Sequence, residues 1–157
     1  MQIRRAVEQE AAELSELAFD AKRLWAYADA QMERWRPDLS VTAAMLAAHQ
    51  AFVMEHEGRI AGFYLLTQAV IACSLEHLWV RPEFNRRGIG GLLLAHAQAL
   101  AAGNGIVEIH IDSDPNAEAF YLRAGAQRVD IIAAPIGGDP QRIRPQLVLR
   151  LKPRTST

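Results

Sequence analysis

The sequence contains one cysteine, Cys73, and no long apolar run. One cysteine cannot form an intrachain disulfide, so a disulfide-stapled scaffold is excluded. No segment approaches the roughly 18 apolar residues of a membrane-spanning helix, and the N-terminus has no apolar signal core. These absences predict a cytoplasmic protein with no membrane partner. Cys73 lies within the apolar stretch AVIACSL, which predicts a buried thiol and not a nucleophile.

The chain also lacks an excess of charge of either sign. Its 17 basic residues are balanced by 18 acidic ones, and the formal net charge is -1. Proteins that bind a nucleic-acid backbone non-specifically carry clustered positive charge. No nucleic-acid partner is therefore expected, and any basic function must be local. Arg86 and Arg87 are the first place to look for it.

Repeats, low-complexity segments and interdomain linkers are absent as well, which predicts one domain over residues 1–152 with a loose tail at 153–157. Apolar periodicity predicts an α/β fold with a mixed sheet. One or two short helices are expected between residues 20 and 39, ending before Pro37, and a helix capped by Ser40 or Thr42 follows. The other predicted helices cover residues 8–19, 90–102 and 114–125, and the predicted strands cover 2–7, 51–56, 59–68, 69–80, 105–112, 127–135 and 146–152.

The segment NRRGIGG, residues 85–91, stands between a predicted strand and a predicted helix. A helix that starts in a glycine turn presents free N–H groups and the positive end of its dipole to an anion. The two arginines add charge-assisted donors. The segment therefore predicts a pyrophosphate site, with a tight turn that merely needs glycine as the alternative.

Several better-known motifs are absent. A P-loop needs Lys and Ser/Thr where Leu92 and Leu93 stand, and a dinucleotide fingerprint needs glycine at position 93. No nucleophile-elbow pattern supports a hydrolase. His110 and Asp112 share one strand face, but no third ligand accompanies them, so no metal is expected.

The glycine segment resembles the acetyl-CoA signature of the GNAT superfamily of N-acetyltransferases: Gln or Arg, two variable residues, Gly, one variable residue, then Gly or Ala. Asn85 departs from the first position of that signature. NAEAFYLRAGAQRV, residues 116–129, resembles the family's later Asn-x-x-Ala-x-x-Phe-Tyr-x-x-x-Gly helix. The order of elements is similar over nearly all of the chain. The resemblance implies the GNAT fold, a mostly antiparallel twisted sheet flanked by helices.

The resemblance also implies acetyl-CoA as co-substrate and transfer of its acetyl group to a primary amine. Main-chain groups of the strand preceding the corner would bind the pantetheine arm, the corner itself the pyrophosphate, and Asn116 the coenzyme near that arm. The implied coenzyme-binding residues are Leu78, Trp79, Val80, Asn85, Arg86, Arg87, Gly88, Ile89, Gly90, Gly91, Asn116 and Tyr121.

Tyr121 matches the family tyrosine that protonates the leaving thiolate; without the resemblance it would be read as a core aromatic. Glu76 resembles a strand glutamate that is a base in some relatives, often through water, whereas His77 has the better-matched intrinsic pKa. Because strand side chains alternate, only one of the two can face the substrate. Glu76 is preferred, and solvent remains a third proton acceptor.

Acceptor specificity would come from the helices after the first strand. Trp25, Tyr27 and Met32 could line an apolar pocket or cover a cationic amine, or simply pack on the sheet. A small-molecule amine acceptor is expected, and a homodimer is left open. Arg142 and Arg144 could meet a substrate carboxylate or be solvated. The alternatives to an enzyme of this type are a non-catalytic acyl-CoA sensor and an amide hydrolase.

Overall fold

The structure is a computed structural model that describes residues 1–152. The predicted tail, residues 153–157, lies outside the described residues. The strands are β1 Gln2–Arg5, β2 Gln50–His56, β3 Arg59–Leu66, β4 Ala72–Val80, β5 Glu108–Asp112, β6 Gln127–Ala133 and β7 Ile143–Arg150. The helices are α1 Ala11–Arg23, α2 Asp29–Leu39, α3 Ala43–Ala48, α4 Ile89–Gly103 and α5 Glu118–Arg123, with 3-10 turns η1 Glu8–Glu10 and η2 Pro82–Phe84.

The strands are hydrogen-bonded in the order β1-β2-β3-β4-β5-β7-β6. β1 with β2, β2 with β3, β5 with β7 and β6 with β7 pair antiparallel, whereas β4 and β5 pair parallel. The predicted mixed, mostly antiparallel sheet flanked by helices is therefore confirmed. No helix within residues 1–152 is both long and apolar enough to cross a bilayer.

The chain divides into two compact units. The first contains residues 1–68 and 77–97, and the second contains residues 69–76 and, of the described chain, residues 98–152. β4 and α4 each contribute residues to both units. The expectation of a single domain over residues 1–152 stays a prediction.

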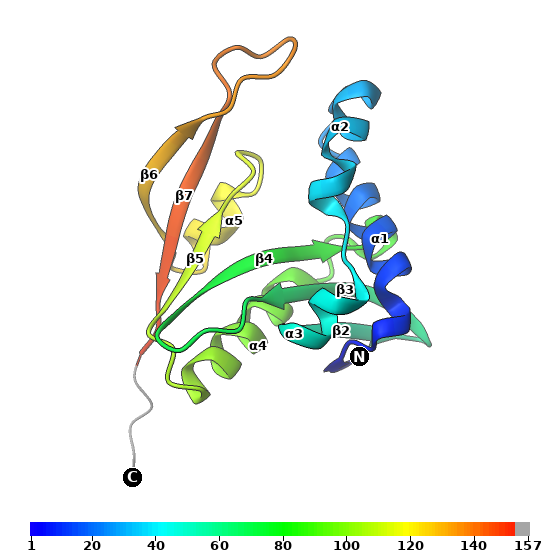
Figure 1. Cartoon of the computed structure of the whole chain (residues 1–157), viewed down its shortest axis with the longest axis vertical. Helices are drawn as coiled ribbons and strands as arrows, with labels where there is room; N and C mark the ends of the chain where they lie inside the picture. Colours follow the sequence, from blue (N-terminus) through cyan, green and yellow to red (C-terminus); the bar gives the residue numbers. More distant parts are fainter. Residues whose placement is uncertain (153–157) are drawn as a thin grey trace. The chain divides into compact units, whose positions relative to one another are not determined.

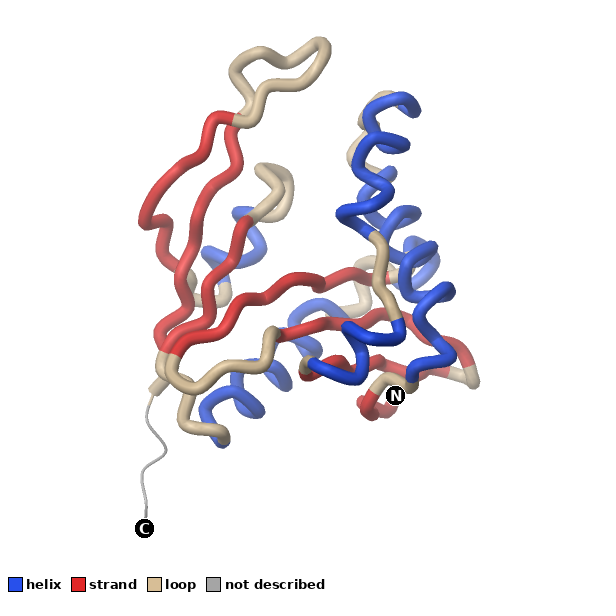
Figure 2. Tube along the Cα trace, viewed as in Figure 1, coloured by secondary structure: helices blue, strands red, loops and turns tan. Residues whose placement is uncertain are grey.

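The first unit packs α1, α2 and α3 against β2 and β3 (Figure 1). Leu14 and Leu17 of α1, Met32 of α2 and Phe63 of β3 are fully buried in this core. Burying a side chain of this size contributes about 1.5–3 kcal/mol. α1 and α2 run beside one another and are joined by a short loop (Figure 2).

The second unit is built on the β5-β7-β6 strands and α5. Burial alternates along β5, where Ile109 and Ile111 are buried, whereas Leu147, Val148 and Leu149 of β7 are buried in succession. The edge strand β6 is exposed along its whole length. β6 and β7 form a long hairpin whose connecting loop extends beyond the paired residues (Figure 1).

The predicted hairpin turn at Glu57 and Gly58 is confirmed. Both residues have positive φ, 52° and 76°, which is the backbone of a two-residue type I′ turn. Thr42, one of two predicted caps, accepts the Met45 N–H at 3.1 Å and caps α3.

The predicted boundaries of three helices were wrong. The helix predicted over residues 8–19 spans Ala11–Arg23 as α1, after the 3-10 turn η1. α2 does not end before Pro37 but continues to Leu39, because a proline this close to the end of a helix removes one i→i−4 hydrogen bond and leaves the rest of the turn intact. Ser40 follows as the C-cap residue. The Ser40 hydroxyl donates to the Arg36 carbonyl at 2.7 Å. Asp114 was predicted to cap a helix starting beside it, but α5 begins at Glu118. The Asp114 carboxylate instead accepts the Asn116 N–H at 2.8 Å and closes a turn before the helix.

Gly62 of β3 has tightly packed surroundings. A Cβ there would lie 2.7 Å from the Trp79 carbonyl oxygen and 3.0 Å from Leu93 Cδ1. We expect Gly62→Ala to destabilise the protein by about 2 kcal/mol, because backbone must shift to admit the methyl group. Urea denaturation measures this change. Gly103→Ala, where the new Cβ meets nothing within 4 Å, is the control and should leave stability unchanged or slightly raised; equal midpoints for the two variants would contradict the prediction.

Candidate functional site

The glycine-rich corner connects η2 to α4. Arg86 and Gly88 adopt left-handed backbone conformations, with φ of 64° and 75°. A hydrogen bond of 3.1 Å from the Leu92 N–H to the Gly88 carbonyl opens α4. The N–H groups of residues 89–91 precede this bond and, as at any helix start, have no partner within the helix. They lie at the positive end of the helix dipole, which favours an anion.

Buried residues on both sides hold the corner in place. Phe84 and Ile89 are buried, whereas residues 85–88 between them are exposed. Arg81, at the end of β4, donates from Nε to the Ile60 carbonyl at 2.8 Å and from Nη2 to the Glu13 carboxylate at 3.0 Å. The turn is therefore anchored at its ends and open to solvent in its middle.

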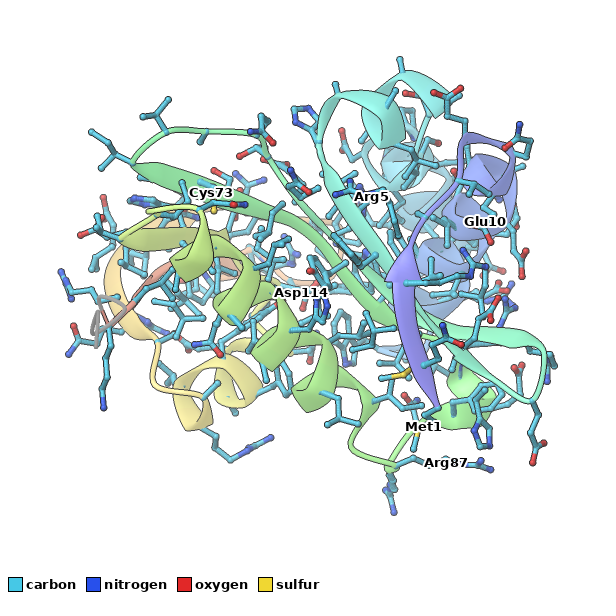
Figure 3. The ribbon with its side chains drawn as sticks, turned by 90° about the horizontal axis from the view of Figure 1, so that it is seen from below. Met1, Arg5, Glu10, Cys73, Arg87 and Asp114 are labelled. Atoms are coloured by element: carbon cyan, nitrogen blue, oxygen red, sulfur yellow. The ribbon has the colours of Figure 1, made fainter. Side chains whose placement is uncertain are left out.

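Positive charge gathers at this corner. The Arg86 and Arg87 side chains are exposed, and Arg87 extends outward from the turn before α4 (Figure 3). The Arg87 guanidinium lies 5.2 Å from the centre of the Phe84 ring, and that of Arg59 lies 5.4 Å from the same ring. Arg59 also pairs with Glu83 at 3.4 Å. Because Arg59 and Arg87 both contact Phe84, the positive charge of Arg59 from the β2–β3 hairpin lies close to the corner.

The space over the glycines fits an approaching anion. A Cβ added to Gly88 or Gly91 would meet nothing within 4 Å, so the surface above this backbone is open. Exposed guanidinium groups, free N–H groups and open glycine backbone together suit a phosphate oxygen. These residues therefore fit the pyrophosphate group that the sequence predicts for them.

Leu78, Trp79 and Val80 occupy the C-terminal end of β4, where all three are half-buried. The strand continues into Arg81, whose N–H donates to the Ala61 carbonyl at 2.7 Å. Pairing with β3 thus holds this end of the strand. The predicted role of the three residues in binding a pantetheine arm stays a prediction.

His77 is held firmly by its neighbours in the first unit. Its Nδ1 accepts a hydrogen bond from the Trp79 indole Nε1–H at 3.0 Å. The Phe63 ring is centred 5.7 Å from the imidazole. His77 is 5% exposed, and this burial lowers its pKa to about 4. The imidazole is therefore neutral at neutral pH.

Glu76 precedes His77 on β4, and alternation along the strand directs the two side chains to opposite faces. The Glu76 side chain is exposed, in contrast to the buried imidazole. An exposed carboxylate can exchange a proton with water directly. Which of the two is the base stays a prediction.

In the second unit, Asp114 organises the turn that carries Asn116. Its carboxylate accepts from the Asn116 side-chain Nδ2 at 2.9 Å and pairs with Arg142 at 3.4 Å. The Arg142 and Asp114 side chains are only 4% and 5% exposed. Neither sequence-based alternative for Arg142, a substrate carboxylate or solvent, matches this buried ion pair. Arg144 pairs with Asp112 at 3.5 Å and keeps part of its side chain exposed.

Tyr121 lies on α5 and is 7% exposed. Its ring contacts Phe120 edge to face, with centroids 5.2 Å apart. Burial raises the pKa of the phenol above its ordinary value, so the hydroxyl carries its proton throughout the neutral range. A protonated hydroxyl on a fixed helix has the state that a general acid needs.

The aromatic residues expected on the acceptor side lie in the first unit and differ in exposure. Met32 is 1% exposed and belongs to the core, whereas Trp25 and Tyr27 are half-buried. Trp25 packs against Trp79 with ring centroids 6.0 Å apart. Tyr27 meets Trp35 edge to face at 4.7 Å. Their role in binding an acceptor stays a prediction.

Lys22 contacts these aromatic rings, and the sequence did not predict this contact. Its Nζ lies 4.1 Å from the Trp35 ring centre and 5.8 Å from that of Tyr27. The i,i+2 spacing of His77 and Trp79 on one strand could have indicated their contact, because such residues share a face. Nothing in the sequence indicated that Lys22 or Arg59 would reach its aromatic neighbour.

Comparisons with known proteins agree with this architecture. The profile of the acetyltransferase (GNAT) domain matches residues 47–125, just over half of the chain. No curated protein matches the sequence.

Solved structures match over nearly the whole length. The PaiA N-acetyltransferase of Thermoplasma acidophilum in complex with coenzyme A is 18% identical, with a TM-score of 0.78 over 95% of this chain and 98% of that one. A GCN5-related N-acetyltransferase of Rhodopseudomonas palustris is 22% identical, with a TM-score of 0.79 over 96% and 95%. The ribosomal-protein-S18-alanine N-acetyltransferase of Escherichia coli is 15% identical, with a TM-score of 0.73 over 99% and 98%.

At these identities the structural likeness concerns the fold, while the domain profile concerns the sequence itself. The profile match covers the corner segment at residues 85–91. The chain belongs to the GNAT acetyltransferase family.

Proposed function

We propose that this protein transfers an acetyl group from acetyl-CoA to a primary amine, with both substrates bound at once. The observation that carries the proposal is the corner at residues 85–91, where open glycine backbone, a helix start and two exposed arginines meet in a member of this family. The similar Thermoplasma acidophilum structure is a complex with coenzyme A. An anion site of this kind suits the coenzyme's pyrophosphate.

The chemistry requires an amine nitrogen to attack the thioester carbonyl carbon while the carbon–sulfur bond breaks. Negative charge develops on the carbonyl oxygen, and a backbone N–H at Leu78 to Val80 would stabilise it. The departing sulfur takes a proton, which Tyr121 supplies. Its burial keeps that hydroxyl protonated until the thiolate forms.

The amine must also lose a proton, because an alkyl amine with a pKa near about 10.4 is mostly charged at neutral pH. We assign this step to Glu76 acting through water. Its exposed carboxylate supports the assignment, and so does the engagement of the His77 Nδ1 with Trp79. If His77 were the base instead, it would have to break its hydrogen bond with Trp79 in order to accept a proton at Nδ1.

A small amine is the proposed acceptor. The half-buried aromatics Trp25 and Tyr27 suit an apolar or cationic group better than a long acidic peptide. The name of the similar Escherichia coli enzyme refers to a protein alanine as its acceptor, so the fold by itself does not select the acceptor class.

Calorimetric titration of the purified protein with acetyl-CoA, followed by a panel of amines with detection of free thiol, tests the proposal. We expect micromolar binding and thiol release with a subset of the amines. Binding without release from any amine would instead favour a non-catalytic acyl-CoA sensor. No binding at all would overturn the assignment of the corner, and hydrolysis without coenzyme would point to an amide hydrolase.

A further inference from the structure

The environment of His77 differs from that of a general base. The Trp79 indole has a donor and no acceptor, so the 3.0 Å contact requires His77 Nδ1 to be the acceptor. A neutral imidazole carries one proton, which must then reside on Nε2. The contact with Trp79 therefore selects one tautomer, and the free ring nitrogen is a donor.

The ring is also fixed in orientation. Phe63, which is fully buried, lies against the imidazole with an interplanar angle of 31°. Trp79 is itself held by Trp25 and by the core of the first unit. A side chain locked on both sides can present its remaining N–H in a constant direction, which is a requirement for stabilising charge in a reaction.

The Nε2–H is also not sealed inside the fold. Among the side chains of residues 1–152, Nε of Arg144 is enclosed and has no hydrogen-bond partner. Nε2 of His77 is not an enclosed, unsatisfied atom of this kind. No protein group in the described chain accepts from Nε2, so an enclosed N–H would have been left unsatisfied. The N–H is therefore not fully enclosed, as a donor to a small molecule must be.

We propose that His77 donates a hydrogen bond from Nε2 to an oxygen of the reactants. Trp79 positions the imidazole by donating its indole N–H to Nδ1. The inference rests on the proposed function. The receiving oxygen belongs either to the thioester carbonyl, where charge develops, or to an oxygen-bearing amine acceptor. His77 is then a hydrogen-bond donor in catalysis and not the proton acceptor.

Two amide substitutions separate the roles of the two ring nitrogens. In His77→Gln the side-chain N–H₂ can replace the Nε2–H, whereas in His77→Asn the amide oxygen can replace Nδ1 as the partner of Trp79. We expect His77→Gln to retain kcat within about 5-fold, and His77→Asn to lose about 100-fold, the typical effect of removing one donor to a developing charge.

A kcat of His77→Asn equal to or higher than that of His77→Gln would overturn the proposal. If His77 only satisfies the Trp79 N–H, Asn should be the better replacement; if His77 is the base, both amides should fail alike. Urea denaturation of each variant separates lost catalysis from lost folding. His96→Asn is the matched control: its Nδ1 is bonded to the Tyr64 hydroxyl at 2.7 Å, and we expect it to change stability without changing kcat.

A second measurement does not depend on activity. In ¹⁵N NMR of the wild-type protein we expect the His77 pattern of a neutral ring protonated at Nε2, and in Trp79→Phe a detectable share of the Nδ1–H form. A proton found on Nδ1 in the wild-type protein would refute the proposal even if the enzyme proved active. Failure of acetyl-CoA binding would leave this spectrum unaffected, so the two proposals fail separately.

The amine panel identifies the receiving oxygen. If it is the thioester carbonyl, His77→Asn should lower kcat for all accepted amines by a similar factor. If it belongs to the acceptor, the variant should raise KM for ethanolamine while leaving KM for propylamine unchanged. Identical kcat and KM for the wild-type protein and His77→Asn with both amines would contradict the proposal.

Discussion

Gly88→Val is expected to weaken acetyl-CoA binding by about 100-fold, equivalent to the loss of one or two charge-assisted hydrogen bonds. Gly88 has φ of 75°, a conformation that a β-branched residue adopts only with strain. Its surroundings are open, so the isopropyl group would occupy the space in which the pyrophosphate approaches the N–H groups of residues 89–91. Isothermal titration calorimetry with acetyl-CoA measures the change directly.

Gly58→Val is a closely matched control. Gly58 has φ of 76°, and a Cβ there also meets nothing within 4 Å, but it lies in the β2–β3 turn. Both variants should therefore lose similar folding stability through backbone strain, while only Gly88→Val should lose coenzyme binding. Equal affinities in the two variants would show that the corner does not hold the pyrophosphate.

Tyr121→Phe is expected to lower kcat by about 100-fold or more, within the range for loss of a general acid, with little change in acetyl-CoA affinity. The hydroxyl is protonated at neutral pH because burial raises the pKa of the phenol. Phenylalanine keeps the ring and its contact with Phe120 but cannot protonate the thiolate. Steady-state thiol release and calorimetric titration together separate the effect on rate from the effect on binding.

Tyr64→Phe tests whether any buried tyrosine would behave in this way. Tyr64 is fully buried, burial likewise raises its pKa, and its hydroxyl bonds His96 at 2.7 Å. Removing that hydroxyl should cost about 1 kcal/mol of stability and leave kcat unchanged. If Tyr121→Phe affects only stability in the same manner, Tyr121 is a core aromatic and not the acid.

Short sequence patterns predicted the turns and caps whose conformation depends on neighbouring residues in the chain. Glu57-Gly58 predicted a hairpin turn because a glycine between two strand-like runs supplies positive φ without strain. Thr42 predicted a helix cap because its hydroxyl reaches the N–H three residues on. The prediction from Pro37 was wrong because the effect of a proline depends on its position, and one in the last turn removes a single hydrogen bond without ending the helix.

The candidate site likewise contains a part that the sequence predicted and a part that it did not. Residues 85–91 could be recognised because anion binding at a helix start uses contiguous backbone, whose geometry the glycines reveal. The burial of Arg142 against Asp114, the contact of Lys22 with Trp35 and the position of Arg59 beside Phe84 join residues far apart in the chain. No local pattern encodes such partners.

The family, the order of the elements and the glycine corner could be predicted from the sequence, because each depends on short-range spacing or on a contiguous motif. The protonation and orientation of individual side chains depend on the folded structure. Burial sets the protonation of His77 and Tyr121, and the packing of Phe63 and Trp79 sets which imidazole nitrogen carries the proton. Desolvation and hydrogen bonding depend on neighbours that folding brings together, so these properties emerge only when the chain has folded.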